Sequence, residues 1–153
     1  MSADLRTELR QQKPFGSLAH EAFLSVARTD ALLREGIERL LAPHDLTLAQ
    51  YNVLRVLRGA ESAGLCRNEI RDRLITRMPD VSRLLDRMEA AELIHRNRSS
   101  EDRRQVKTTL TAKGRTLVDQ LDAPMAREHE RQFARLDATQ TKTLIDLLAL
   151  IRN

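Results

Sequence analysis

The stretch MPDVSRLLDRMEAAELIHRNRSSEDRRQVKTTLTAKG, residues 78–114, decides the fold because its hydrophobic period changes partway along. Its first half places apolar residues at i, i+3, i+4 and i+7, the spacing of one buried helix face. These residues are Val81, Leu84, Leu85 and Met88. Beyond them LIHRNR, residues 93–98, alternates briefly, and QVKTTLT, residues 105–111, is rich in β-branched residues. The stretch therefore predicts a helix over residues 79–92, followed by a two-stranded hairpin with a polar tip.

The predicted helix over residues 79–92 also has a polar face. A step of about 100° per residue puts Arg83 nearly opposite the buried stripe. Its neighbours on that outer face are Pro79, Ser82, Asp86 and Arg87. Pro79 fits the first helical turn, where its missing N–H has no intrahelical partner to lose. The outer face is therefore polar and arginine-bearing, and a solvated surface with i,i+3 and i,i+4 ion pairs is the plain alternative.

Three helices are predicted upstream of this stretch. Residues 17–42 repeat apolar side chains at helical spacing. Thr47 and Gln50 have the spacing of a capping box that starts a second helix, and Gly59 stands where a C-terminal glycine would end it. A short helix over residues 67–74 completes the set.

Downstream of the hairpin the pattern becomes helical again. TAKG, residues 111–114, opens a long helix in which Pro124 predicts a kink or a loose turn. TQTKTLIDLLALIRN, residues 139–153, is amphipathic and strongly apolar. The fold class expected is mainly α with a small β-hairpin, in the order helix, helix, short helix, arginine-faced helix, hairpin, long helix, helix.

A helix–turn–helix followed by a β-hairpin is the winged helix plan, in which the second helix enters the major groove of DNA. We expect a single domain over residues 1–153, with residues 46–111 as the winged helix DNA-binding lobe. Residues 17–45 and 112–153 are expected to form a helical dimerisation lobe. The alternative is that these apolar helices pack within one chain.

The positive charge is concentrated in one segment. The 153 residues carry a net charge of +4. Residues 66–115 contain thirteen lysines and arginines against eight acids, whereas the remainder contains thirteen against fourteen. Such an uneven distribution favours a module that binds a polyanion, although a solvated charged face gives the same count.

Composition argues against several other classes of protein. Only 3% of the residues are aromatic and five are glycines, so neither a base-stacking platform nor a nucleotide-binding loop is expected. No apolar run is long enough for a membrane span, and a single cysteine agrees with a cytoplasmic protein. No metal site is expected, because the four histidines lack partners at ligand spacing. No catalytic group or cofactor is expected either, because the sequence has no nucleophile motif and no paired-carboxylate arrangement. Cys66 is interpreted as a small buried hydrophobe, with a redox role as the alternative.

The stretch over residues 78–114 resembles the MarR family of bacterial transcription regulators. The resemblance rests on VSRLLDRMEAAELI and on a wing of the form D-x-R-x-x-x-V-x-L-T-x-x-G. The wing residues of this chain are Asp102, Arg104, Val106, Leu110, Thr111 and Gly114, although the interval from valine to leucine reads VKTTL. Glu92 stands where many members have glycine after the recognition helix.

The resemblance implies an obligate homodimer that binds pseudo-palindromic double-stranded DNA and acts as a repressor. It also implies regulation by a small aromatic or phenolic effector or by an oxidant. No residue pattern in the sequence identifies an effector pocket. On this basis the predicted contacts of the recognition helix are Pro79, Ser82, Arg83 and Arg87, with Arg83 at the base edges or phosphates. The predicted wing residues are Asp102, Arg103 and Arg104, with Arg104 in the minor groove and Asp102 bracing it. The predicted phosphate contacts are Arg77 and Lys107. The principal rival is a winged helix that docks an acidic partner protein.

Overall fold

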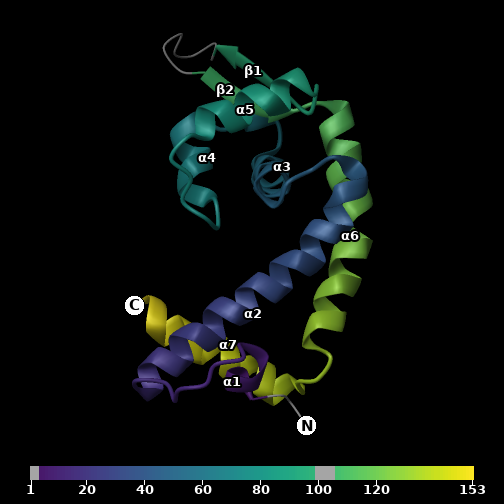
Figure 1. The fold of residues 1–153 in the computed structure, drawn as a ribbon. Coiled ribbons are helices and arrows are strands. Elements are labelled where there is room, and N and C mark those ends of the chain that lie inside the picture. Colours follow the sequence, from purple (N-terminus) through teal and green to yellow (C-terminus); the bar gives the residue numbers. More distant parts are fainter. Residues whose placement is uncertain (1–3, 99–105) are drawn as a thin grey trace. The chain divides into compact units, whose positions relative to one another are not determined.

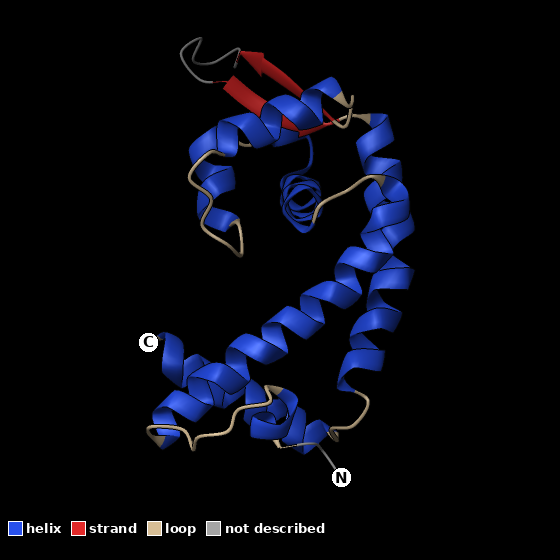
Figure 2. Ribbon diagram, in the orientation of Figure 1, coloured by secondary structure: helices blue, strands red, loops and turns tan. Residues whose placement is uncertain are grey.

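The computed structural model describes residues 4–98 and 106–153, and Figure 1 shows their elements in order. The helices are α1 (Leu5–Glu8), α2 (Leu18–Leu41), α3 (Leu48–Ala60), α4 (Arg67–Arg73), α5 (Val81–Ala90), α6 (Ala112–Phe133) and α7 (Ala138–Arg152). Short 3-10 turns lie at η1 (Ala42–His44) and η2 (Glu61–Ala63), and the strands are β1 (Ile94–Arg98) and β2 (Val106–Leu110). The predicted class, mainly α with one hairpin, is confirmed (Figure 2).

The chain divides into two compact units, residues 1–36 and residues 37–153. The first unit holds α1 and most of α2. The Ser17 hydroxyl accepts a hydrogen bond from the His20 N–H at 3.1 Å, which caps the start of α2. Arg28 on α2 forms an ion pair with Glu8 on α1 at 3.8 Å. The assignment of residues 46–111 to one lobe remains a prediction.

The second unit contains the hydrophobic core. Its most completely buried side chains come from α3, α4, α5, β1 and the first half of α6, together with the end of α2. They are Leu41, Val53, Leu54, Leu57, Ile70, Leu85, Met88, Ile94, Val118 and Leu121. The predicted stripe of α5 is buried in full, because Val81, Leu84, Leu85 and Met88 are all less than 9% exposed. Burial of this stripe leaves the opposite face of α5 in solvent.

Local capping fixes where the central helices begin. The Gln50 N–H donates to Thr47 Oγ1 at 3.2 Å and the Thr47 N–H donates to Gln50 Oε1 at 2.8 Å, so the predicted capping box starts α3. At α5 the Asp80 carboxylate accepts the Arg83 N–H at 3.0 Å, which makes Asp80 the N-cap. Pro79 therefore precedes the helix, and its predicted place in the first helical turn is wrong.

At two helix ends a residue other than glycine has a positive φ. The prediction that Gly59 ends α3 is wrong, because the helix runs to Ala60 and Glu61 takes the positive φ of 53°. After α5 the turn is made by Glu92 with φ 59°, as its position in the sequence required. Both carboxylate-bearing residues thus accept a conformation that normally favours glycine.

The hairpin pairs β1 with β2 in antiparallel register, from Ile94 opposite Leu110 to Arg98 opposite Val106. Leu65 adds an isolated antiparallel bridge to Thr108 on the outer edge of β2. Thr108 is 1% exposed, and it is the one buried polar residue among residues 4–98 and 106–153. The base of the hairpin is therefore packed into the second unit.

The long helix α6 begins where the wing motif ends. The Gly114 N–H donates to Thr111 Oγ1 at 2.9 Å, and a Cβ on Gly114 would lie 2.1 Å from the Leu93 carbonyl oxygen. This close approach explains why the motif ends in glycine. Pro124 does not break the helix, which continues to Phe133, so the predicted loose turn is not formed. No helix in residues 4–98 and 106–153 is long and apolar enough to cross a membrane.

Candidate nucleic-acid interface

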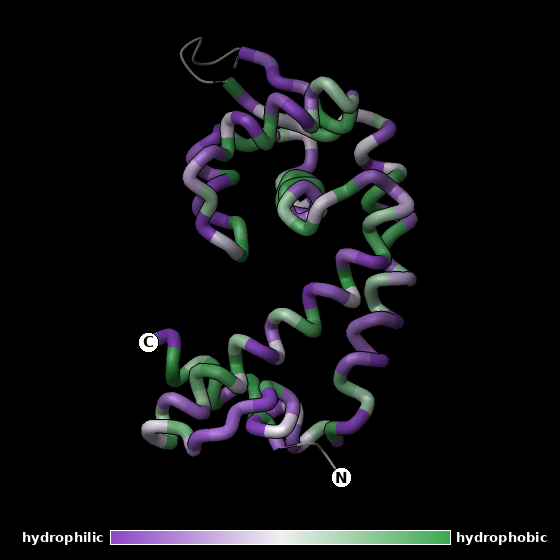
Figure 3. Tube along the Cα trace, in the orientation of Figure 1, coloured by the Kyte–Doolittle hydropathy of each residue, from purple (hydrophilic) through white to green (hydrophobic). Residues whose placement is uncertain are grey.

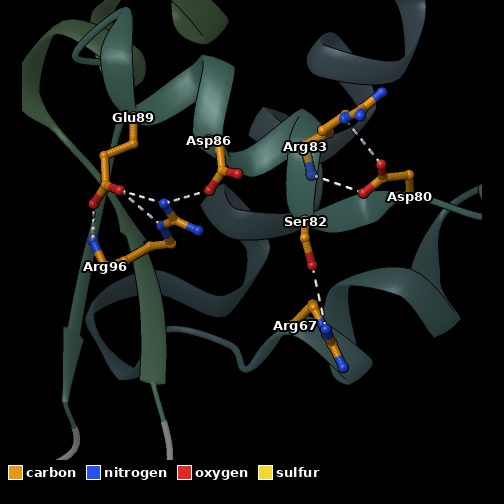
Figure 4. Close-up of polar contacts among 7 residues, drawn as sticks. All are labelled: Arg67, Asp80, Ser82, Arg83, Asp86, Glu89 and Arg96. Carbon is orange, nitrogen blue, oxygen red and sulfur yellow. Dashed lines mark hydrogen bonds and ion pairs between the residues drawn. The ribbon is translucent and has the colours of Figure 1, made fainter.

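The outer face of α5 presents Arg83 to solvent. Its side chain is 79% exposed, and its Nε lies 3.4 Å from the Asp80 carboxylate (Figure 4). Asp80 thus caps the helix through the backbone of Arg83 and also holds the guanidinium of the same residue. The predicted position of Arg83, opposite the buried stripe, is confirmed.

Ser82 connects α5 with α4. Arg67 at the start of α4 donates from Nη1 to Ser82 Oγ at 3.2 Å, and Ser82 is half-buried (Figure 4). The predicted polar contact residue is therefore already engaged by an arginine that the sequence did not single out. Arg67 itself is exposed, so this pair adds a second cation beside the N-terminal half of α5.

Arg77 and Arg87 are exposed cations on either side of Arg83. Within the described ranges neither has an ion pair. Asp86, next to Arg87 in the sequence, pairs with Arg96 on β1 at 2.7 Å. Arg87 is therefore left with its charge directed to solvent.

Arg96 forms a polar cluster with two carboxylates of α5. Its Nε and Nη2 donate to Glu89 Oε2 at 2.8 and 2.5 Å, and its backbone N–H donates to Glu89 Oε1 at 3.2 Å (Figure 4). The hydrogen bond from Arg96 lowers the pKa of Glu89 and raises that of Arg96. Sequence reasoning missed this cluster, although Glu89 and Arg96 are only seven residues apart.

A second ion pair joins the other strand to α4. The Lys107 ammonium lies 3.4 Å from Glu69 Oε2, and the same oxygen accepts the Cys66 N–H at 2.7 Å. The Cys66 N–H and then Lys107 lower the pKa of Glu69 to about 2. Lys107, the predicted phosphate contact, therefore has a carboxylate neighbour inside the protein. Cys66 is half-buried at the N-cap of α4, where its backbone contributes to this arrangement.

These residues surround a depression between α4, α5 and the hairpin, with a volume of about 730 Å³. Its polar lining includes Arg67, Asn68, Glu69, Ser82, Arg96 and Lys107. Three cations (Arg67, Arg96 and Lys107) and one carboxylate (Glu69) therefore line this depression. The predicted wing residues Asp102, Arg103 and Arg104 lie outside the described residues.

A further ion cluster ties α3 to α6, away from α5. Arg58 Nη1 lies 2.7 Å from Asp119 and 2.8 Å from Asp122, and Arg58 Nη2 donates to Asp122 at 2.8 Å. These hydrogen bonds raise the pKa of Arg58 and lower that of Asp122. The partners are 61 and 64 residues apart, so the local sequence pattern gives no signal of the cluster. In the described part of the chain, no three His, Cys, Asp or Glu side chains gather as metal ligands would.

Comparisons with known proteins agree with this geometry. A family model described as transcriptional regulator SarA/Rot matches residues 36–121. The chain is 31% identical over 115 residues to the HTH-type transcriptional repressor Rv2887 of Mycobacterium tuberculosis, covering 75% of this chain and 81% of that relative. It is 45% identical over 83 residues to the HTH-type transcriptional regulator TtmR of Methylorubrum extorquens, covering 54% of this chain but only 42% of that relative.

Two solved structures extend the similarity to the whole fold. The MarR transcription factor from Planctomyces limnophilus is 36% identical with a TM-score of 0.68, and the match covers 90% of this chain and 99% of that one. The transcriptional repressor CouR, solved bound to a 23-mer DNA duplex, is 29% identical with a TM-score of 0.79, covering 94% and 100%. Fold and relatives together define a winged helix-turn-helix transcriptional regulator of the DNA-binding class, and not an enzyme. The chain belongs to the MarR and SarA/Rot family of transcriptional regulators.

Proposed function

We propose that this regulator is a homodimeric repressor that binds a pseudo-palindromic operator in double-stranded DNA and is released by a small-molecule effector. The observation that carries the proposal is the arrangement of α5. Its apolar stripe is fully buried, whereas Arg83 and Arg87 on the other face are exposed. A helix held in this way can enter a major groove with its arginines toward the base edges.

In this proposal Arg83 reads a base or holds a phosphate at the N-terminal half of α5, with Ser82 beside it. Arg77 and Arg87 contact phosphates on either side, and Lys107 does so from the base of the hairpin. Pro79 lies just before the N-cap and shapes the entry to the helix. From the sequence motif, Arg104 would enter the minor groove, with Arg103 nearby and Asp102 as its brace. Residues 46–111 would thus act as the DNA-binding lobe.

Dimerisation is supported by apolar side chains that stay exposed in the single chain. On α7 the exposed fractions are 52% for Ile145, 55% for Leu147, 74% for Leu150 and 73% for Ile151. Figure 3 shows α7 as a largely hydrophobic segment. In the first unit Leu18 is 83% exposed and Phe23 69%. Apolar surface of this kind is typical of helices that pack against a second subunit, and two-fold symmetry would match paired half-sites.

The proposed effector has a suitable cavity inside the second unit. Its volume is about 280 Å³, and Ile37, Tyr51, Arg55, Arg73, Met125 and His129 are among its lining residues. The Arg55 guanidinium donates to the Tyr51 hydroxyl at 3.2 Å, which places a cation beside an aromatic ring. Apolar walls with cationic side chains suit a small aromatic acid or phenol. Such a ligand would release DNA only by binding one conformation more tightly than another.

The proposal is tested by selecting bound sequences from a random duplex pool with the full chain. We expect a palindrome whose half-sites lie about one helical turn apart. Arg83→Ala should then weaken operator binding, whereas Arg135→Ala, which removes the same charge from an exposed site outside α5, should have little effect. If both variants bind equally well, or if random duplex DNA competes as effectively as the selected operator, the proposed sequence-specific mechanism is wrong. Recovery of no DNA at all would favour the acidic protein partner instead.

A further inference from the structure

One pair of opposite residues in the hairpin, which we call a rung, is hydrogen-bonded to the rest of the second unit at both edges of the hairpin. Arg96 and Thr108 stand opposite each other in the antiparallel register. The Thr108 N–H and C=O both pair with Leu65, at 2.8 and 3.0 Å, so the backbone of Thr108 faces outward. In an antiparallel ladder its partner then faces outward as well. The Arg96 N–H accordingly donates to the Glu89 carboxylate at 3.2 Å.

On the β1 side this attachment is made to the recognition helix itself. Glu89 accepts three hydrogen bonds from Arg96, one from the backbone and two from the guanidinium. Asp86, one turn earlier on α5, holds Nη2 of the same guanidinium at 2.7 Å. The Arg96 side chain is 27% exposed, whereas those of Glu89 and Asp86 are 38% and 60% exposed. We call Glu89, Asp86 and Arg96 the wing clip.

The charge of the wing clip argues against a direct phosphate contact. Its two carboxylates and one guanidinium sum to a net charge of −1, and the pKa of Glu89 is lowered, so Glu89 stays ionised at neutral pH. A phosphate approaching Arg96 would meet both carboxylates. The clip is therefore a poor anion site, and its function must lie in what it holds in place.

The wing clip can fix the direction in which the short hairpin of β1 and β2 points. A two-stranded hairpin alone is marginally stable in water, so contacts at its base set where it points. We propose that the wing clip fixes the wing relative to α5, with Arg96 and Glu89 as positioning residues for operator recognition. The inference rests on the proposed function, because only a specific site requires the helix and the wing to engage two grooves in one register.

The test compares operator DNA with random duplex DNA for the full chain, by fluorescence anisotropy over a series of salt concentrations. Glu89→Gln makes the protein more positive, so electrostatics alone would tighten binding to any duplex. Positioning predicts instead that the ratio of operator to random affinity falls about tenfold, the value of one well-aligned base contact. The matched control is Glu92→Gln, which removes an exposed carboxylate two residues beyond the end of α5, and it should keep the wild-type ratio.

Arg96→Gln separates positioning from phosphate binding. Loss of a phosphate contact would reduce the slope of log affinity against log salt by about 0.9, whereas loss of a positioning residue leaves the slope unchanged and lowers the ratio. Partial unfolding would lower both affinities equally and leave the ratio intact, so the ratio reports positioning even in a less stable variant.

A wild-type ratio in Glu89→Gln, or a reduced slope in Arg96→Gln, overturns the inference while leaving the proposed function standing. A wild-type protein without any preference for an operator overturns both.

Discussion

Replacing Gly114 by alanine tests the close packing between the start of α6 and the turn after α5. A Cβ at this position would lie 2.1 Å from the Leu93 carbonyl oxygen and 3.0 Å from the Leu93 carbonyl carbon. The obstacle is backbone, so no side chain can rotate away. The Thr111 N–H also donates to the Leu93 carbonyl at 3.1 Å, which ties the start of α6 to the same atom. The methyl group therefore forces the helix and the turn apart.

The magnitude follows from the size of the overlap. Ordinary contact begins near 3.4 Å, so the backbone at Leu93 must retreat by roughly 1 Å. Overpacking of this kind costs about 1–3 kcal/mol. Stretching the hydrogen bond from Thr111 destabilises the folded protein by about 1 kcal/mol more. The higher helix propensity of alanine offsets about the same amount. A net loss of about 2 kcal/mol corresponds to a fall in Tm of roughly 4–8 °C for a chain of this size.

The assay is thermal and urea unfolding at a fixed protein concentration, with Gly59→Ala as the matched control. Gly59 also lies within a helix, but a Cβ there meets nothing within 4 Å. The control should therefore gain about 0.5–1 kcal/mol from lower chain entropy in the unfolded state. The two glycine substitutions are expected to have opposite signs. Equal stabilisation of both proteins would refute the steric argument at Gly114.

Three further outcomes are expected. Thr47→Ala removes the capping box of α3 and should cost about 1 kcal/mol in urea unfolding, whereas an unchanged midpoint would mean that Gln50 alone caps the helix. Leu85→Ala empties a site that is 2% exposed and should cost about 2–5 kcal/mol, and a loss below 1 kcal/mol would contradict its place in the core. The pKa of Glu69 is lowered to about 2 from its ordinary 4.5, so its contribution to stability is complete above pH 4.5 and disappears as the pH falls through 2. Carboxyl NMR titration should find that low midpoint, and Lys107→Met should raise it; a midpoint near 4.5 in the wild-type protein would contradict the contacts with Cys66 and Lys107.

The local features of the fold were predictable from the sequence. The buried stripe of α5 depends only on a period of 3.6 within one helix, and the capping box of Thr47 depends on residues three positions apart. The errors fell at helix ends: Pro79 precedes the N-cap Asp80 and is not in the first turn, and the residue with positive φ after α3 is Glu61 and not Gly59. In both cases the helix end lies one or two residues from the predicted position.

The ion pairs that organise the interface were not predictable in the same way. Arg96 meets Glu89 only because the turn after α5 folds β1 back along the helix. Lys107 reaches Glu69 from 38 residues away in the sequence. Charge placement located the basic segment, but it could not assign individual cations to partners. The predicted exposure of Arg83 is confirmed because it follows from the buried stripe, whereas its contact with DNA remains a prediction.

The rung formed by Arg96 and Thr108 also bears on how the protein avoids aggregation. A two-stranded hairpin has two edges, and the unpaired backbone groups of an edge are a template on which another chain can add a strand. At this rung the N–H and C=O of Thr108 are both hydrogen-bonded to Leu65, and the N–H of Arg96 donates to the Glu89 carboxylate. An incoming strand would have to displace one of these partners before it could form a ladder along the base of the wing. At this rung strand addition is therefore blocked along β2 by Leu65 and hindered along β1 by Glu89.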